Sequence, residues 1–88
     1  MDHAELATNL LAIISPGDAM IQRMIAAGEP ITAVITLIEV AARQRRVVPQ
    51  ALLDAVQRLL DEHAIDAEDV TGAAADLNAL HAAALTLQ

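Results

Sequence analysis

The chain has 88 residues and a formal net charge of −7, with five arginines, no lysine, no cysteine and no aromatic residue. An acidic chain repels nucleic-acid phosphates and anionic membrane surfaces, so both are disfavoured as partners. The lack of cysteine excludes disulfides, thiolate metal sites and a cysteine nucleophile. An acidic start and the absence of an apolar run long enough for a bilayer predict a soluble, cytoplasmic protein.

Helix-start signals divide the N-terminal third of the chain into two predicted helices. Asp2, followed three residues later by Glu5, resembles a capping arrangement and opens a helix to about Ile14. Ser15 is expected to cap a second helix, with a proline in its first position, and Gly28 to end it.

A third helix is predicted at about 30–46, and its segment 31–42 is apolar on nearly every side. The polar residues of this region form one line at steps of three and four: Glu29, Thr32, Thr36, Glu39, Arg43 and Arg46. Within it, Glu39 and Arg43 are spaced for an ion pair along the helix. A helix this apolar has to be surrounded by protein, and a short chain has few elements to surround it. Self-association is therefore predicted.

Two more helices are predicted in the C-terminal half. Pro49 opens the fourth, which runs to about Ala64 with His63 facing inward. Asp66 is expected to cap the fifth, whose apolar positions alternate by three and four: Val70, Ala73, Leu77, Leu80, Ala84 and Leu87. The pattern predicts a single all-α domain over 1–88, a bundle of four to five short helices around the helix at about 30–46. We expect a homodimer, with the third helix or the apolar line of the fifth at its interface.

Three of the five arginines, Arg43, Arg45 and Arg46, stand close together at the expected end of the third helix. Guanidinium groups recognise carboxylates and phosphates, so this cluster is a candidate docking patch. The alternative is structural, because cations in the last turn of a helix oppose its dipole.

The segment 54–76 carries seven carboxylates and one arginine. It is a candidate surface for a basic partner, or a mimic of nucleic-acid phosphate, through Asp61, Glu62, Asp66, Glu68 and Asp69. The alternative is again the helix dipole, since acidic residues stabilise a helix start. If the fourth helix runs back along the third, the acidic loop lies ~20 Å from the arginine cluster at 1.5 Å per residue. The two patches are then poor partners within one chain but are suited to pair between chains.

No catalytic, cofactor or metal motif is present in the sequence. The three histidines, His3, His63 and His81, lack the Glu-x-x-His spacing of helical di-iron sites. The only serine, Ser15, is predicted to act as a cap, and the three glycines stand too far apart for a phosphate loop. No enzyme activity and no cofactor are therefore expected.

These observations predict a non-enzymatic protein–protein interaction module: an adaptor, regulator or assembly subunit that associates with itself. The residues predicted to carry the interaction are Ile31, Ile35, Leu37 and Ile38 by packing, with Arg43, Arg45 and Arg46 as a charged edge. Two alternatives are kept. One is an acidic inhibitor that docks on a basic partner, and the other is a carrier of a small apolar ligand in an aliphatic cavity.

Overall fold

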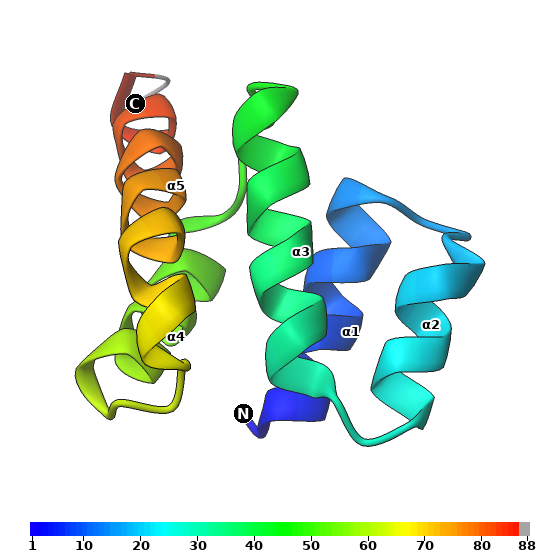
Figure 1. Ribbon diagram of the computed structural model, residues 1–88. Helices are drawn as coiled ribbons and strands as arrows, with labels where there is room; N and C mark the ends of the chain where they lie inside the picture. Colours follow the sequence, from blue (N-terminus) through cyan, green and yellow to red (C-terminus); the bar gives the residue numbers. More distant parts are fainter. Residues whose placement is uncertain (87–88) are drawn as a thin grey trace.

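Five segments of the chain form α-helices in the computed structural model, which describes residues 1–86 (Figure 1). They are α1 (His3–Ile14), α2 (Ala19–Ala26), α3 (Pro30–Arg43), α4 (Gln50–Asp61) and α5 (Ala67–Thr86). Residues 1–86 contain no strand. The predicted all-α fold, a small helical bundle with α3 at its centre, is confirmed.

The predicted helix starts at Asp2, Pro30 and Pro49 agree with the structure. Asp66 stands directly before α5. The Asp2 carboxylate accepts a hydrogen bond from the Glu5 backbone N–H at 2.7 Å, and Pro30 is the first residue of α3. The prediction that Ser15 caps the second helix is wrong. Ser15 ends α1, and Asp18 caps α2 by accepting from the N–H groups of its first turn at 3.0 and 3.1 Å. Asp18 is the cap because it occupies the position directly before the first residue of α2, where a side-chain oxygen can reach the free N–H groups.

Three helices end in the same hydrogen-bonded turn, in which the residue after the C-cap takes a left-handed conformation. That residue is Gly28 after α2, Arg45 after α3 and His63 after α4, with φ of 81°, 54° and 57°. The predicted end of α3 at about 46 is therefore wrong, because Arg45 and Arg46 lie beyond the helix. The inward placement of His63 is also wrong, since His63 follows the end of α4 and is exposed.

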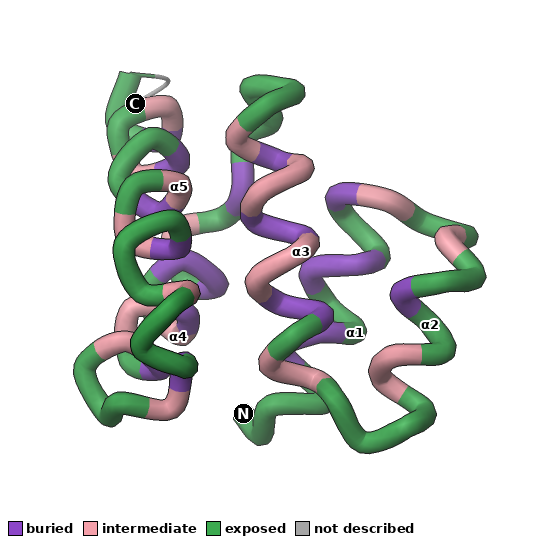
Figure 2. The backbone as a smooth tube through the Cα atoms, in the orientation of Figure 1, coloured by how far each residue is buried: buried purple, intermediate pink, exposed green. Residues whose placement is uncertain are grey.

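The core forms around α3, which packs against α1, α2 and α5, while α4 packs against α5 and α1 (Figure 1). Buried positions recur along α3, as Figure 2 shows, and they are Ala33, Val34, Leu37, Ile38 and Ala41. Two connecting segments are anchored in the same core by Val48 and Ile65. The large buried side chains are all aliphatic, as the composition dictates.

The two surfaces predicted to form a dimer interface, on α3 and α5, are buried within the single chain. The core face of α3 is covered by neighbouring helices, and Ala73, Leu77, Leu80 and Ala84 of α5 are buried. Val70 remains 38% exposed, and Leu87 lies outside the described residues. A second copy is thus not required to bury these faces. The homodimer stays a prediction, and it has to use another surface.

Within the described part of the chain, no helix has the length and hydropathy needed to cross a membrane. The longest helix, α5, contains three carboxylates, Glu68, Asp69 and Asp76.

Candidate functional site

An open groove with a volume of about 430 Å³ lies between α3 and α5. Its α3 wall consists of Ile35, Glu39 and Arg43. Its α5 wall consists of Glu68, Asp69, Gly72, Ala73 and Asp76. We call this feature the acidic groove, because four of its eight lining side chains are carboxylates.

The local sequence of each helix explains why a groove forms here. On α3, steps of four residues place Ile35, Glu39 and Arg43 on one line, opposite the apolar face that packs in the core. On α5, Gly72 and Ala73 supply almost no side-chain volume. A β-carbon built at Gly72 meets no atom within 4 Å, so the space above this glycine is open. The groove is therefore the result of small residues on α5 facing a polar line on α3.

Negative charge dominates the acidic groove. Glu39 and Arg43 form the predicted ion pair, and it is the only one among residues 1–86. Partial burial raises the pKa of the Asp76 carboxyl, the Glu39 carboxylate raises it further, and the Arg43 guanidinium lowers it. The single arginine therefore leaves an excess of carboxylate charge in a site that is partly shielded from water.

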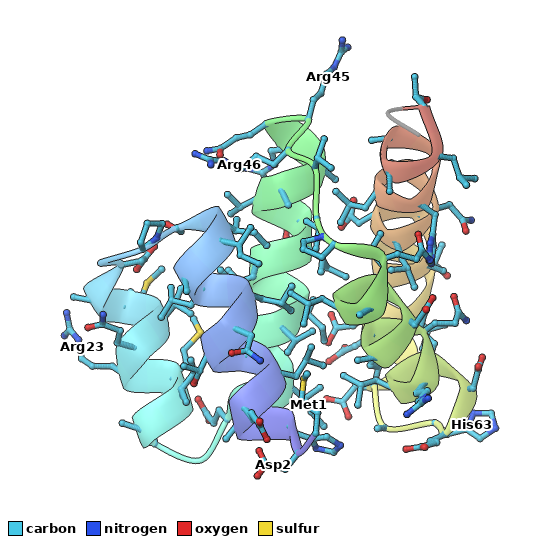
Figure 3. The ribbon with its side chains drawn as sticks, turned by 180° about the vertical axis from the view of Figure 1, so that it is seen from behind. Met1, Asp2, Arg23, Arg45, Arg46 and His63 are labelled. Carbon is cyan, nitrogen blue, oxygen red and sulfur yellow. The ribbon has the colours of Figure 1, made fainter. Side chains whose placement is uncertain are left out.

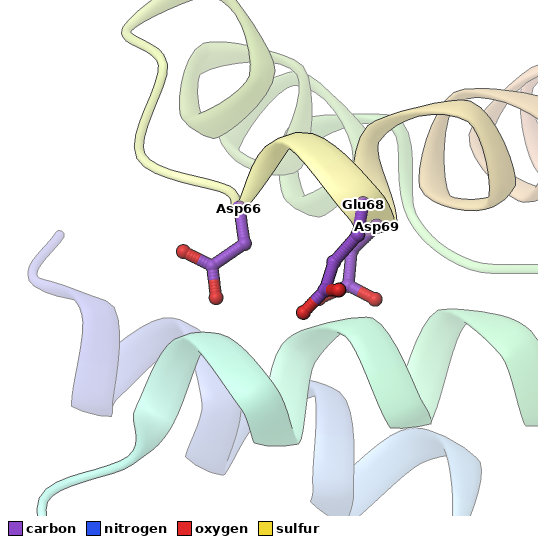
Figure 4. A group of neighbouring side chains, drawn as sticks. All are labelled: Asp66, Glu68 and Asp69. Atoms are coloured by element: carbon purple, nitrogen blue, oxygen red, sulfur yellow. The ribbon is translucent and has the colours of Figure 1, made fainter.

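A denser group of carboxylates stands at one end of the acidic groove. Oxygens of Asp66, Glu68 and Asp69 lie within 4.8 Å of one another, and their side chains project from the start of α5 toward α3 (Figure 4). Such oxygens are the donors that hard cations such as Ca²⁺ prefer. The same residues also stabilise the start of α5 through the helix dipole. The dipole accounts for their position without a metal.

The structure separates the four predicted packing residues into two kinds. Leu37 and Ile38 are fully buried in the single chain, so they stabilise the core and offer no surface to a partner. Ile31 and Ile35 are half-buried against the core. Ile35 is the only one of the four that lines the acidic groove.

The three predicted basic residues are also divided. Arg43 ends α3 and lines the acidic groove. Arg45 points away from the molecule, and Arg46 donates a hydrogen bond to the Gln44 side chain at 3.0 Å (Figure 3). The interpretation that these cations oppose the dipole in the last helical turn therefore applies to Arg43 alone.

Sequence analysis missed part of the acidic groove. It singled out Glu68 and Asp69, which line it, together with Asp61, Glu62 and Asp66, which do not. It did not assign Gly72 or Asp76 to a site. The sequence shows a glycine inside a predicted helix and an acidic residue one helical turn later. These two residues indicate a groove only once α5 is known to pack against α3.

The three histidines do not form a common site in the structure. His81 on α5 is hydrogen-bonded to the Gln50 side chain of α4 at 3.0 Å, and Gln50 also donates to Asp54 at 2.9 Å. His3 and His63 are exposed. Among residues 1–86, no histidine belongs to a group of side chains close enough to share a metal ion.

A second open groove, of about 410 Å³, lies on α2 and the turn after it. Its lining is Met20, Arg23, Met24, Ala27 and Glu29. Met20 is 58% exposed there, which makes this surface more apolar than the acidic groove. It bears on the predicted apolar-ligand carrier, but it is an open surface with two charged residues, Arg23 and Glu29, whereas the prediction is an aliphatic cavity between helices.

Comparison with known proteins adds no assignment. The chain matches no protein-family model, no curated protein and no solved structure. Function therefore has to be argued from the acidic groove itself, from its shape, its charge and the residues that line it.

Proposed function

We propose that this protein is a non-enzymatic docking module that binds a basic segment of a protein partner in the acidic groove. The observation that carries the proposal is the concave surface between α3 and α5, in which four carboxylates face a single guanidinium. Arginine and lysine side chains complement such a surface, because charge-assisted hydrogen bonds to carboxylates are the strong ones.

The contact between Glu39 and Arg43 supports the choice of ligand. Here the groove already holds a guanidinium from its own chain against one carboxylate. Glu68, Asp69 and Asp76 take part in no ion pair within residues 1–86, so their charges are available to a partner. A guanidinium offers five donors in a planar fork, and it is less strongly hydrated than an ammonium group. We therefore expect arginine to be preferred over lysine.

Gly72 provides a second line of support. Glycine within a helix destabilises it by roughly 0.5–1 kcal/mol relative to alanine. No neighbour requires the glycine, because a β-carbon at this position would meet nothing within 4 Å. A residue that lowers stability without a packing reason is expected where function needs it. At Gly72 the missing side chain keeps the acidic groove open.

The test is direct binding of a labelled arginine-rich peptide, measured by fluorescence anisotropy against a neutral peptide of equal length. The groove variant, Glu68→Gln with Asp76→Asn, should weaken binding about tenfold, which corresponds to roughly 1.4 kcal/mol. Raising the salt concentration should weaken binding by the wild type, since the contacts are partly exposed. A lysine peptide of the same length should bind less tightly.

The matched control is Glu5→Gln with Asp54→Asn, which removes two exposed carboxylates from α1 and α4, outside the acidic groove. It should leave the peptide affinity within twofold of the wild type. Equal losses in the groove variant and in this control would mean that overall negative charge attracts the peptide. That result, or binding that is indifferent to salt, would overturn the proposal.

The two alternatives from the sequence remain predictions with their own signatures. An acidic inhibitor would bind a basic partner through Asp61, Glu62, Asp66, Glu68 and Asp69, and its affinity should fall steeply as the salt concentration rises. A carrier would use the α2 groove, and it predicts an apolar molecule that co-purifies with the chain. Removing that molecule should lower the melting temperature.

A further inference from the structure

The acidic groove and the most basic segment of the chain are complementary surfaces on one molecule. We infer that the groove binds Arg45 and Arg46 of a second copy of this chain, here called the basic segment. The inference rests on the proposed function and names its partner. Copies then join with the basic segment of one molecule in the acidic groove of the next.

The basic segment is presented outward by the way α3 ends. Arg45 has φ of 54°, a left-handed conformation that disfavours residues with a β-carbon by roughly 1–2 kcal/mol. Its side chain points away from the molecule in Figure 3 and forms no hydrogen bond or ion pair within residues 1–86. Arg46 follows on the same exposed turn. Two guanidinium groups are thus held outside the helices, where a partner can reach them.

Within residues 1–86 neither of these two arginines is paired with a carboxylate, and the hydrogen bond that Arg46 donates to Gln44 leaves its charge unpaired. Arg43 lines the acidic groove of its own molecule, whereas Arg45 and Arg46 do not. The start of α5, at one end of the groove, and the end of α3, which the basic segment follows, lie at opposite ends of the molecule in Figure 1. Pairing between copies therefore brings together groups that the fold keeps apart.

The apolar surfaces expected at a dimer interface are already buried in the monomer, so this contact depends on charge. The net charge of −7 on each copy opposes it at low ionic strength. At about 0.15 M salt the Debye length is about 8 Å, which screens distant charges more than contacting pairs. At high salt the contacting pairs weaken as well. Association should therefore be strongest at intermediate ionic strength.

The contact is also asymmetric, because a groove receives a segment. Such a contact extends from copy to copy unless a two-fold arrangement closes it. The test uses complementary variants and native mass spectrometry. The segment variant, Arg45→Glu with Arg46→Glu, keeps the acidic groove, and the groove variant keeps the basic segment. Each alone should remain at the mass of one chain, 9.3 kDa.

Mixed in equal amounts, the two variants should form a heterodimer that grows no further. The wild type should associate as its concentration rises, into a dimer if a two-fold arrangement closes the contact and into longer oligomers if it does not. A charge-matched control, Arg23→Glu with Arg58→Glu, changes two exposed arginines of α2 and α4 and should associate as the wild type does. Circular dichroism checks that each variant is helical.

The outcomes separate this inference from the proposed function. The segment variant should bind the arginine-rich peptide with wild-type affinity, because its groove is intact. A wild type that binds the peptide but stays monomeric at every salt concentration overturns the inference and leaves the docking function standing. A mixture of variants that stays monomeric while the wild type dimerises also overturns it. If neither peptide nor second copy binds, both proposals fall.

Discussion

The two sides of α3 differ in packing and in charge. Toward the core, its five buried residues pack with α1, α2 and α5 and are aliphatic or alanine. On the opposite line, Ile35, Glu39 and Arg43 border the open acidic groove. The first side is dry and closely packed, whereas the second is charged and accessible.

The difference lies in what α3 faces on each side. The core side meets large side chains such as Leu10, Ile14 and Leu77, which fill the space between the helices. The groove side meets Gly72 and Ala73, which leave space open. Substitutions on the core side should therefore change the free energy of unfolding, and those on the groove side should chiefly change binding.

The sharpest test compares Leu37→Ala with Ile35→Ala on the two sides of the same helix. Leu37 is 0% exposed, so its truncation leaves a cavity and should destabilise the fold by about 2–5 kcal/mol. Ile35 is half-buried beside open space, and its truncation should cost about 1 kcal/mol, part of the value for a fully buried side chain. Urea unfolding followed by circular dichroism measures both. Equal losses would mean that the groove side also carries the core.

A residue with a left-handed backbone conformation stands near each end of α3, Gly28 before it and Arg45 after it. Arg45→Gly should stabilise the fold by roughly 1 kcal/mol, because glycine adopts the left-handed conformation without a steric penalty. The same variant should weaken self-association, since it removes a guanidinium from the basic segment. Gly28→Ala makes the opposite change at the turn before α3 and should destabilise by roughly 1 kcal/mol. Thermal melts of the two variants measure the opposite changes in stability, and native mass spectra measure self-association. A lower melting temperature for Arg45→Gly than for the wild type would contradict the prediction.

The helices could be predicted from sequence because their signals are local. Asp2, Pro30 and Pro49 mark starts that the structure reproduces, and the apolar spacing identified most of the core. The end of α3 could not be read in the same way. A left-handed residue is usually a glycine, and Arg45 gives no sign of that conformation.

The acidic groove could not be predicted because it belongs to the packing of two helices. Glu39 and Asp76 are 37 positions apart in the sequence, and nothing in their local patterns brings them together. The sequence identified the acidic character of the segment 54–76 and singled out Glu68 and Asp69, but it did not bring them together with Glu39. Only the arrangement of α3 beside α5 places Glu39 and Arg43 opposite Glu68, Asp69 and Asp76.

Asp76 offers the smallest and most specific test of the groove side. Its pKa in the folded protein is raised above 3.8, chiefly by partial burial and then by Glu39. Between 3.8 and the folded value, the folded state binds more protons than the unfolded state, so stability falls as pH rises through this window. At neutral pH the ionised carboxylate therefore opposes folding.

Asp76→Asn removes this charge, so the variant should be more stable than the wild type at pH 7. The difference should shrink as pH falls toward 3.8, because protonation then neutralises Asp76 in the wild type too. Urea unfolding at a series of pH values measures the difference. Glu5→Gln relieves the same overall repulsion from a site on α1, outside the groove. If it stabilised the chain as much, the effect would come from the net charge of −7. If Asp76→Asn alone stabilises the fold and weakens peptide binding, the acidic groove retains a carboxylate that folding disfavours and recognition requires.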